Sequence, residues 1–160
     1  MKSAGRYILA LVAFAALAAG VATAILRFSG GVSPKYAASD KDPFLTAVAK
    51  GAAPLIRAID RFYAAHGKCP QAQADAVAEL RVGLDRAIEP TIRGDAIEFR
   101  LGRAVTGWTY YSSSQNPTLC TLSTKLGLDP RLIWQRDGGE IQWIFDPGDG
   151  SATKSIALDE

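Results

Sequence analysis

The sequence predicts an α+β protein: an N-terminal transmembrane helix, then an amphipathic helix packed on an antiparallel β-meander. Three observations lead to this prediction. They are an uncharged apolar run near the N-terminus, a middle stretch with helical periodicity, and segments of alternating polarity in the second half. An apolar helical stripe and an apolar sheet face can bury each other, which is the two-layer arrangement of α+β domains.

Residues 7–26 are twenty residues without a charged side chain, preceded by the basic residues Lys2 and Arg6. A helix of this length covers roughly 30 Å, the hydrocarbon thickness of a bilayer. Flanking positive charge stays in the cytoplasm, so we expect a single-pass signal anchor in the inner membrane and a periplasmic C-terminal domain. The alternative is a signal peptide cleaved after Ala18 or Ala24, where small-x-small motifs occur.

The chain divides into the N-terminal segment of residues 1–26, a flexible linker of residues 27–41 and an exported domain of residues 42–160. The linker is rich in glycine and serine and shows little apolar periodicity. Of 18 basic and 16 acidic residues, Lys2 and Arg6 account for the excess, so residues 27–160, the linker and the domain together, are neutral. Without a basic surface, we expect no nucleic-acid partner.

A long amphipathic helix begins after Asp42, which is suited to the N-cap, with a proline at the first helical position. It ends at His66, followed by Gly67, which is suited to the left-handed C-cap. Pro54, together with Gly51, is expected to kink or divide the helix. Apolar residues recur at spacings of three and four, and this stripe comprises Leu45, Val48, Ala52, Leu55, Ile59 and Phe62.

A second, short helix is predicted at residues 72–81. Residues 83–94 show neither helical nor strand periodicity. Alternation then begins, with Ile97, Phe99 and Leu101 expected on the buried face of a strand. The expected strands are residues 97–101, 108–112, 118–126, 131–136 and 140–145.

The last two of these strands form a hairpin around residues 137–139. A turn at Gly138-Gly139 would place the carboxylates of Asp137 and Glu140 opposite each other, and like charges disfavour that pairing. We therefore predict a two-residue turn at Asp137-Gly138. It pairs Trp134 with Ile141 and Leu132 with Trp143.

Cys69 and Cys120 are the two cysteines of the chain. In an exported protein such a pair is more often a disulfide than a metal or catalytic site. Alternation places Cys120 on the core side of its strand, facing the helix that ends just before Cys69. We predict a Cys69–Cys120 disulfide, whose loop of about 52 residues would stabilise the protein by about 4 kcal/mol in the simple entropy model. The alternative is two separate buried thiols.

Two stretches resemble pilins and pseudopilins. The first is the helix end at residues 55–63 followed by His66-Gly67-Lys68-Cys69-Pro70, and the second is the strand Gly107-Trp108-Thr109-Tyr110-Tyr111. In that family an amphipathic helix ends in a glycine and a proline and precedes a meander with similar strands. The resemblance covers residues 44–146 and implies a pilin-like fold.

The processing site of assembling pilins is not matched. In that family a glycine precedes an aromatic or apolar residue and a glutamate follows, whereas here Gly5 precedes Arg6 and Ala10 stands in the glutamate's place. In pilins the membrane helix also continues directly into the domain helix. In this chain Ser29-Gly30-Gly31 and Pro34 interrupt it. The resemblance therefore implies a pilin-like domain on an independent tether.

Catalytic chemistry finds little support in the residue pattern. His66 is the one histidine and lies at a helix end, where a structural role is expected. The serines at residues 112–114 lack nucleophile-elbow spacing, and one histidine with two oxidised cysteines does not suit zinc. We predict no enzymatic activity and no cofactor.

The turn at residues 146–150 is the best candidate for a cation site. Its carboxylates, Asp146 and Asp149, are oxygen ligands of the kind that calcium prefers. Proline and glycine are ordinary turn residues, and a calcium shell needs six to eight oxygens, so a plain turn is the favoured interpretation.

Alternation in the strand at residues 108–112 sends Trp108 and Tyr110 to one side and Tyr111 to the other. An outward Tyr111 is the first candidate contact with another protein. We expect a non-enzymatic, membrane-tethered envelope protein, an accessory to a secretion or pilus-type assembly, with an envelope protein as partner. The alternative is a released periplasmic or secreted domain that binds a small ligand of unknown identity.

Overall fold

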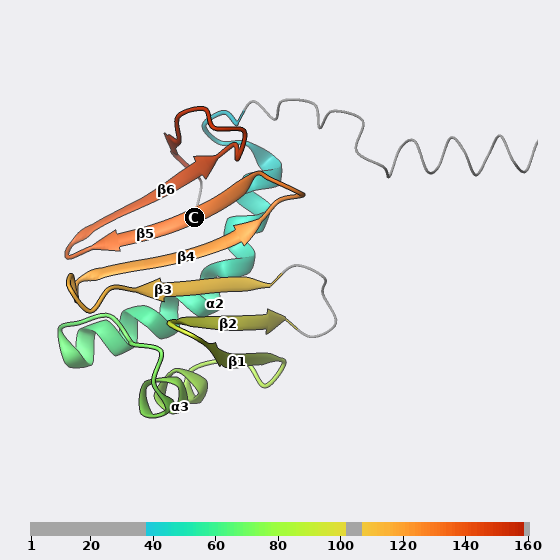
Figure 1. The fold of residues 1–160 in the computed structure, drawn as a ribbon. Coiled ribbons are helices and arrows are strands. Elements are labelled where there is room, and N and C mark those ends of the chain that lie inside the picture. Colours follow the sequence, from blue (N-terminus) through green and yellow to red (C-terminus); the bar gives the residue numbers. More distant parts are fainter. Residues whose placement is uncertain (1–37, 102–106, 159–160) are drawn as a thin grey trace, which may run out of the picture. The chain divides into compact units, whose positions relative to one another are not determined.

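The computed structural model describes residues 38–101 and 107–158 (Figure 1). The predicted signal anchor at residues 7–26 and most of the linker lie outside this part. Within the described ranges, no helix is both long enough and apolar enough to cross a membrane.

Two helices and seven strands make up the described domain, and the strands form one antiparallel sheet in chain order (Figure 1). This confirms the α+β class and the antiparallel meander. The elements are α2 (Pro43–His66), α3 (Ala74–Val82), β1 (Ile88–Arg93), β2 (Ala96–Leu101), β3 (Trp108–Ser112), β4 (Leu119–Lys125), β5 (Arg131–Asp137), β6 (Glu140–Asp146) and β7 (Lys154–Ile156).

Both predicted ends of α2 are confirmed. The Asp42 carboxylate accepts hydrogen bonds from the backbone N–H groups of Phe44 and Leu45 at 2.9 and 3.0 Å. At the other end Gly67 adopts φ +66°, a left-handed conformation that favours glycine, and its N–H donates to the Tyr63 carbonyl at 2.8 Å. These caps satisfy backbone groups that a helix end leaves unpaired.

The prediction that Pro54 would divide α2 is wrong, because the helix runs unbroken from Pro43 to His66. A proline inside a helix removes one hydrogen bond, here the one to the carbonyl of Lys50. Lys50 is exposed, so water can reach that region. Apolar burial before and after the proline, at Ala52 and Leu55, holds the helix to the core.

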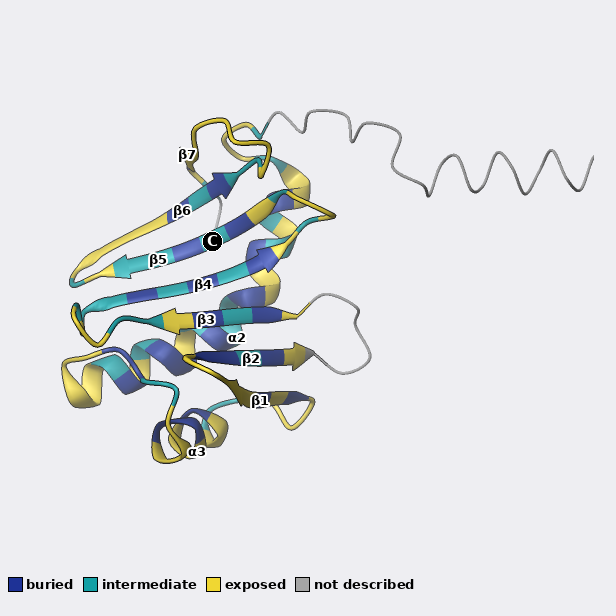
Figure 2. Ribbon diagram, viewed as in Figure 1, coloured by how far each residue is buried: buried dark blue, intermediate teal, exposed yellow. Residues whose placement is uncertain are grey.

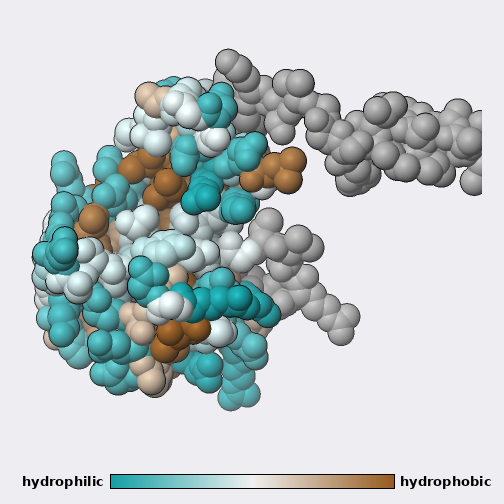
Figure 3. Space-filling model, in the orientation of Figure 1, coloured by the Kyte–Doolittle hydropathy of each residue, from teal (hydrophilic) through white to brown (hydrophobic). Residues whose placement is uncertain are grey.

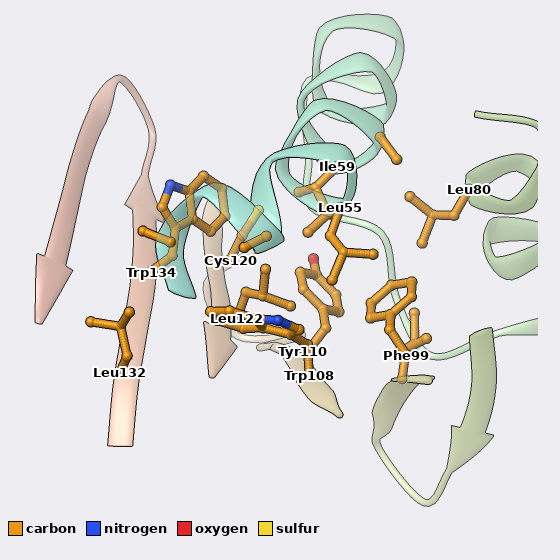
Figure 4. Packing of buried hydrophobic residues seen from close by; sticks show 14 of the residues in the cluster. Leu55, Ile59, Leu80, Phe99, Trp108, Tyr110, Cys120, Leu122, Leu132 and Trp134 are labelled. Atoms are coloured by element: carbon orange, nitrogen blue, oxygen red, sulfur yellow. The ribbon is translucent and has the colours of Figure 1, made fainter. Parts of the chain in front are cut away.

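The core lies between α2 and one face of the sheet. Figure 4 shows Leu55 and Ile59 of α2 and Leu80 of α3 pointing toward Phe99 and Tyr110 of the sheet. Val48, which was expected in the apolar stripe, is only half-buried. The buried residues of α2 are Leu45, Ala49, Ala52, Leu55, Ala58, Ile59 and Phe62.

The Cys69–Cys120 disulfide is confirmed, with 5.7 Å between the two Cα atoms. Both cysteines are completely buried. The backbone N–H of Cys69 also donates to the carbonyl of Pro117 at 2.7 Å. The bridge and this bond fasten the segment after α2 to the start of β4.

The β5–β6 hairpin turns at residues 138–139, so the predicted turn at Asp137-Gly138 is wrong. Trp134 lies opposite Trp143, and not opposite Ile141. The two registers differ by two residues, so Trp143 faces the core side in both. The observed register places Gly138, and not Asp137, at the first turn position, where the common two-residue hairpin turns need positive φ. The apolar pairs are Trp134 with Trp143 and Leu132 with Phe145.

The register places Asp137 opposite Glu140, the pairing that the sequence disfavoured. This pair lies at the exposed hairpin tip, where solvent weakens the repulsion. The hydroxyl of Thr118 also donates to Asp137 Oδ1 at 3.1 Å. Gly138 takes φ +58°, as the first turn residue of a type II′ hairpin does, so the glycine sits where the backbone needs it.

Strands β1 and β7 were not expected from the sequence. β1 carries Pro90, which interrupts a strand pattern and is tolerated because β1 is an edge strand. β7 has three residues, too few to show a period of two. The second helix is confirmed with a small shift, as α3 occupies Ala74–Val82.

Candidate functional site

The sheet has two unlike faces. The inner face packs on α2 and the core, and the strands pass in front of α2 in Figure 1. In the described part of the chain no helix covers the other face, here called the outer face. Buried and more exposed residues alternate along the strands, as Figure 2 shows by colour. The outer face is therefore the surface that the fold offers to a partner.

Strand register assembles two rows of residues across the outer face of β3 to β6. Because neighbours in the rows are directly paired, their side chains lie side by side on the same face of the sheet. We call these rows the uncharged field. The first row is Thr109, Ser123, Ile133 and Ile144, and the second is Tyr111, Thr121, Gln135 and Gln142.

The uncharged field has charges only at its borders. Toward β1, Arg93 and Glu98 form an ion pair at 3.0 Å. Lys125 and Arg131 are paired across β4 and β5 at one end of the rows. Figure 3 shows the same contrast, with pale surface in the middle and hydrophilic surface around it. A partner would meet hydrogen-bonding and apolar groups here, without desolvating charges.

Hydrogen bonds fix part of the field in place. The amide of Gln142 donates to Gln135 Oε1 at 3.4 Å, across β5 and β6. The hydroxyl of Ser123 donates to the carbonyl of Thr109 at 3.5 Å. Side chains that already hold one conformation lose less entropy on binding.

The predicted orientation of the β3 aromatics is confirmed. Trp108 and Tyr110 are 4% and 1% exposed, whereas Tyr111 is 45% exposed on the outer face. Burial raises the pKa of the Tyr110 phenol well above its usual range, so this group stays protonated. Tyr111 offers an aromatic ring and a hydroxyl, a combination enriched at protein interfaces.

The turn carrying Asp146 and Asp149 shows ordinary turn chemistry. Asp146 Oδ1 accepts from the N–H of Gly148 at 2.9 Å, and Asp149 Oδ1 accepts from the N–H and the hydroxyl of Ser151. Over residues 38–101 and 107–158, no three His, Cys, Asp or Glu side chains gather in a way that could hold a metal ion. Calcium at Asp146 and Asp149 stays a prediction.

His66 joins the two helices. Its Nε2 lies 3.0 Å from both carboxylate oxygens of Glu79 on α3, and its ring lies 4.3 Å from that of Phe62. Arg61 adds a second link, since its Nη2 donates to the Gly83 carbonyl at 2.6 Å. These contacts fasten the end of α2 to α3.

Arg136 forms a cluster that the sequence did not indicate. Its side chain lies on the inner face, 16% exposed, with Nη2 3.4 Å from Asp60 Oδ1. Its Cζ lies 4.7 Å from the centre of the Tyr63 ring. The cluster ties β5 to α2. Its members are far apart in the chain, so no local pattern could identify it.

No protein-family model, curated protein or solved structure matches this chain. The resemblance to pilins therefore stays a prediction. The candidate site rests on the geometry and chemistry of the described residues.

Proposed function

We propose that this chain is a non-enzymatic envelope protein that residues 7–26 hold in the inner membrane. Residues 27–41 act as a linker to a pilin-like periplasmic domain. This domain contacts another envelope protein, as an accessory to a secretion or pilus-type assembly, through the uncharged field around Tyr111.

The attachment of residues 38–41 to the domain supports the tether. The N–H of Lys41 donates to the Ala157 carbonyl at 2.8 Å, and the N–H of Ala157 donates to Asp40 Oδ1 at 3.0 Å. Lys154 Nζ donates to the Ala38 carbonyl at 3.3 Å. Residues 38–41 are thus fixed to the domain at Lys154 and Ala157, so a linker would join the domain at this point.

A long helix lying on one face of an antiparallel meander supports the pilin-like interpretation, because the resemblance implies that order and that packing. The unmatched processing site at residues 5–10 argues against assembly into a filament. An accessory protein would have the same kind of domain but would not polymerise.

The single observation that carries the contact surface is the absence of charge across the paired rows of the outer face, with Tyr111 exposed among them. The centres of protein interfaces are depleted in charged residues and enriched in tyrosine. A face of this composition is better suited to binding a protein than to binding a charged polymer.

Photo-crosslinking in cells tests the surface. A photoreactive amino acid replaces Gln135 in the full-length chain, with and without Tyr111→Arg. We expect one adduct of defined mass at Gln135, reduced about tenfold by the added charge because interface centres tolerate buried charge poorly. Leu128→Arg, on an exposed loop, is the matched control and should leave the adduct unchanged. Equal loss in both variants would contradict the proposal.

Intact mass tests the tether. Protein from membrane and soluble fractions is weighed without reductant. A full-length mass in the membrane fraction supports the anchor at residues 7–26. A soluble species that begins at Ala19 or Ile25 would instead support a released periplasmic or secreted domain.

A further inference from the structure

The edges of the sheet are protected unequally. An exposed edge presents unpaired backbone groups to other chains. At β1 the proline at position 90 has no N–H, and Glu89 and Arg93 add charge, so a continuous ladder cannot extend there. β7 has only three residues; just after it, Ala157 exchanges hydrogen bonds with Asp40 and Lys41, and the Lys154 side chain donates to the Ala38 carbonyl, so residues 38–41 lie against this end of the sheet.

The first half of β6 is a further open edge within the part of the chain that the structure describes. β7 pairs only with residues 143–145, so residues 140–142 have a partner strand on the β5 side alone. Figure 2 shows this half of β6 in the colour of exposed residues.

The hairpin register identifies which backbone groups are free. The residues that flank a two-residue turn, Asp137 and Glu140, form a hydrogen-bonded pair, so the N–H and C=O of Ile141 point away from β5. Continuing the β6–β7 register would bring Leu158 opposite Ile141. The chain leaves the ladder after Ile156, and no backbone bond joins these two residues.

A groove of about 470 Å³ lies where the chain after Ile156 separates from β6. Residues 141–143 of β6 line one side, and residues 155–158 with Asp40 line the other. Ile141, which is 45% exposed, and the buried Trp143 and Ile156 give it apolar surface. Among the described residues that line it, Asp40 is the one with a charged side chain.

We infer that this groove accepts an extended peptide of a partner protein, which adds to β6 as a further strand. The peptide exchanges hydrogen bonds with the backbone of Ile141, packs an apolar side chain on Ile141 and Trp143, and places a basic side chain near Asp40. Strand addition of this kind draws affinity from the backbone and specificity from alternate side chains.

The charges at the edge favour this occupant over a second copy of the chain. Asp40 lies in the groove and Glu140 begins the open part of β6. A second copy would bring the same acidic groups to the shared edge, and like charges oppose pairing. A peptide strand that carries basic and apolar side chains would complement the carboxylates of Asp40 and Glu140. Gln142 belongs to both the groove and the uncharged field, whereas Ile141, Trp143 and Asp40 belong to the groove alone.

Peptide binding to the full-length protein in detergent micelles tests the inference. The probe is fluorescein-labelled Lys-Val-Thr-Val-Lys with a C-terminal amide, followed by fluorescence anisotropy. We expect saturable binding, weakened about tenfold or more when all peptide amides are N-methylated, because the backbone donors are then lost. Replacing both lysines by glutamate should weaken it about fivefold or more at low salt.

Two isoleucines provide matched variants. Ile141→Arg should weaken binding about tenfold, whereas Ile92→Arg should leave it within about twofold, because Ile92 is similarly exposed, at 39%, on the proline-blocked edge strand. Asp40→Asn keeps an oxygen for the Ala157 N–H and should reduce binding of the lysine peptide only.

Three results would overturn the inference. The first is no saturable binding up to about millimolar peptide, the weakest affinity worth assigning to a site. The second is equal loss in the Ile92→Arg and Ile141→Arg variants. The third is a dimer in sedimentation that Ile141→Arg dissociates, since the occupant would then be a second copy.

Discussion

Tyr110 and Tyr111 are neighbours in β3 with opposite environments. Tyr110 lies in the core below α2, and Tyr111 lies on the outer face. The pleat of a strand is sufficient to separate them, because successive side chains point to opposite faces. One tyrosine therefore serves stability, and the other is free for contact.

The raised pKa of Tyr110 makes stability depend on pH in the alkaline range. The folded state holds this proton more tightly than the unfolded state, whose pKa is about 10, so the free energy of unfolding falls as pH rises above about 10. The slope from this group is at most about 1.4 kcal/mol per pH unit. We expect Tyr110→Phe to remove this component.

Chemical denaturation between about pH 8 and pH 11, on either side of the ordinary tyrosine pKa, measures the slope. Tyr111→Phe is the control, because it removes the hydroxyl of the neighbouring tyrosine, which lies on the outer face and not in the core. Equal slopes in the wild type and both variants would show that Tyr110 does not govern alkaline unfolding.

The β5–β6 hairpin shows how an element settles its register. Turn chemistry allowed two pairings, and they differ in what opposes Trp134. The observed pairing puts two buried tryptophans together and accepts Asp137 beside Glu140 at the tip. A screened repulsion between exposed charges costs about 1 kcal/mol or less. A turn at Asp137-Gly138 would instead need positive φ at Asp137, which costs about 1 kcal/mol or more in a residue with a Cβ, whereas Gly138 takes that conformation freely.

The turn makes a specific prediction for its two glycines. Gly138 has φ +58° and Gly139 does not lie in the left-handed region. A Cβ at either position would meet nothing within 4 Å, so only backbone conformation distinguishes them. We expect Gly138→Ala to destabilise the protein by about 1 kcal/mol and Gly139→Ala by much less.

Urea denaturation of the two alanine variants measures the difference. The reverse order, with the larger loss at Gly139, would mean that the turn is not at residues 138–139. Gly138→Asn should recover part of the loss, because asparagine tolerates positive φ better than alanine does.

At the scale of the whole molecule, one covalent bond and one layer of apolar side chains join the helical and the sheet halves. The Cys69–Cys120 bridge has a sequence separation of 51, so it closes a long loop. Arg136 adds a polar link from β5 to Asp60 and Tyr63 on α2.

Removing the disulfide tests this account. We expect the double variant Cys69→Ala and Cys120→Ala to lose about 4 kcal/mol of unfolding free energy, because the unfolded chain gains the entropy of an open loop. Guanidinium denaturation of oxidised wild type and double variant measures it. A loss below about 1 kcal/mol would show that the loop contributes little and that packing alone holds the two halves.

The sequence by itself determined the features that depend on neighbours along the chain. The caps at Asp42 and Gly67, the alternation that turns Tyr111 outward, and the identity of the disulfide pair follow from local stereochemistry, strand period and the presence of two cysteines. This covers the long helix, most of the sheet, and one residue of the candidate surface.

Only the tertiary structure decided what depends on distant residues. The uncharged field requires the register of four strands, β1 and β7 require strands to pair with, and the groove beside Ile141 requires the chain to leave the ladder after Ile156. The physical reason is that register, edges and clusters such as that of Arg136 minimise the free energy of the whole packed core. That free energy depends on contacts between distant residues, so no short stretch of sequence determines it.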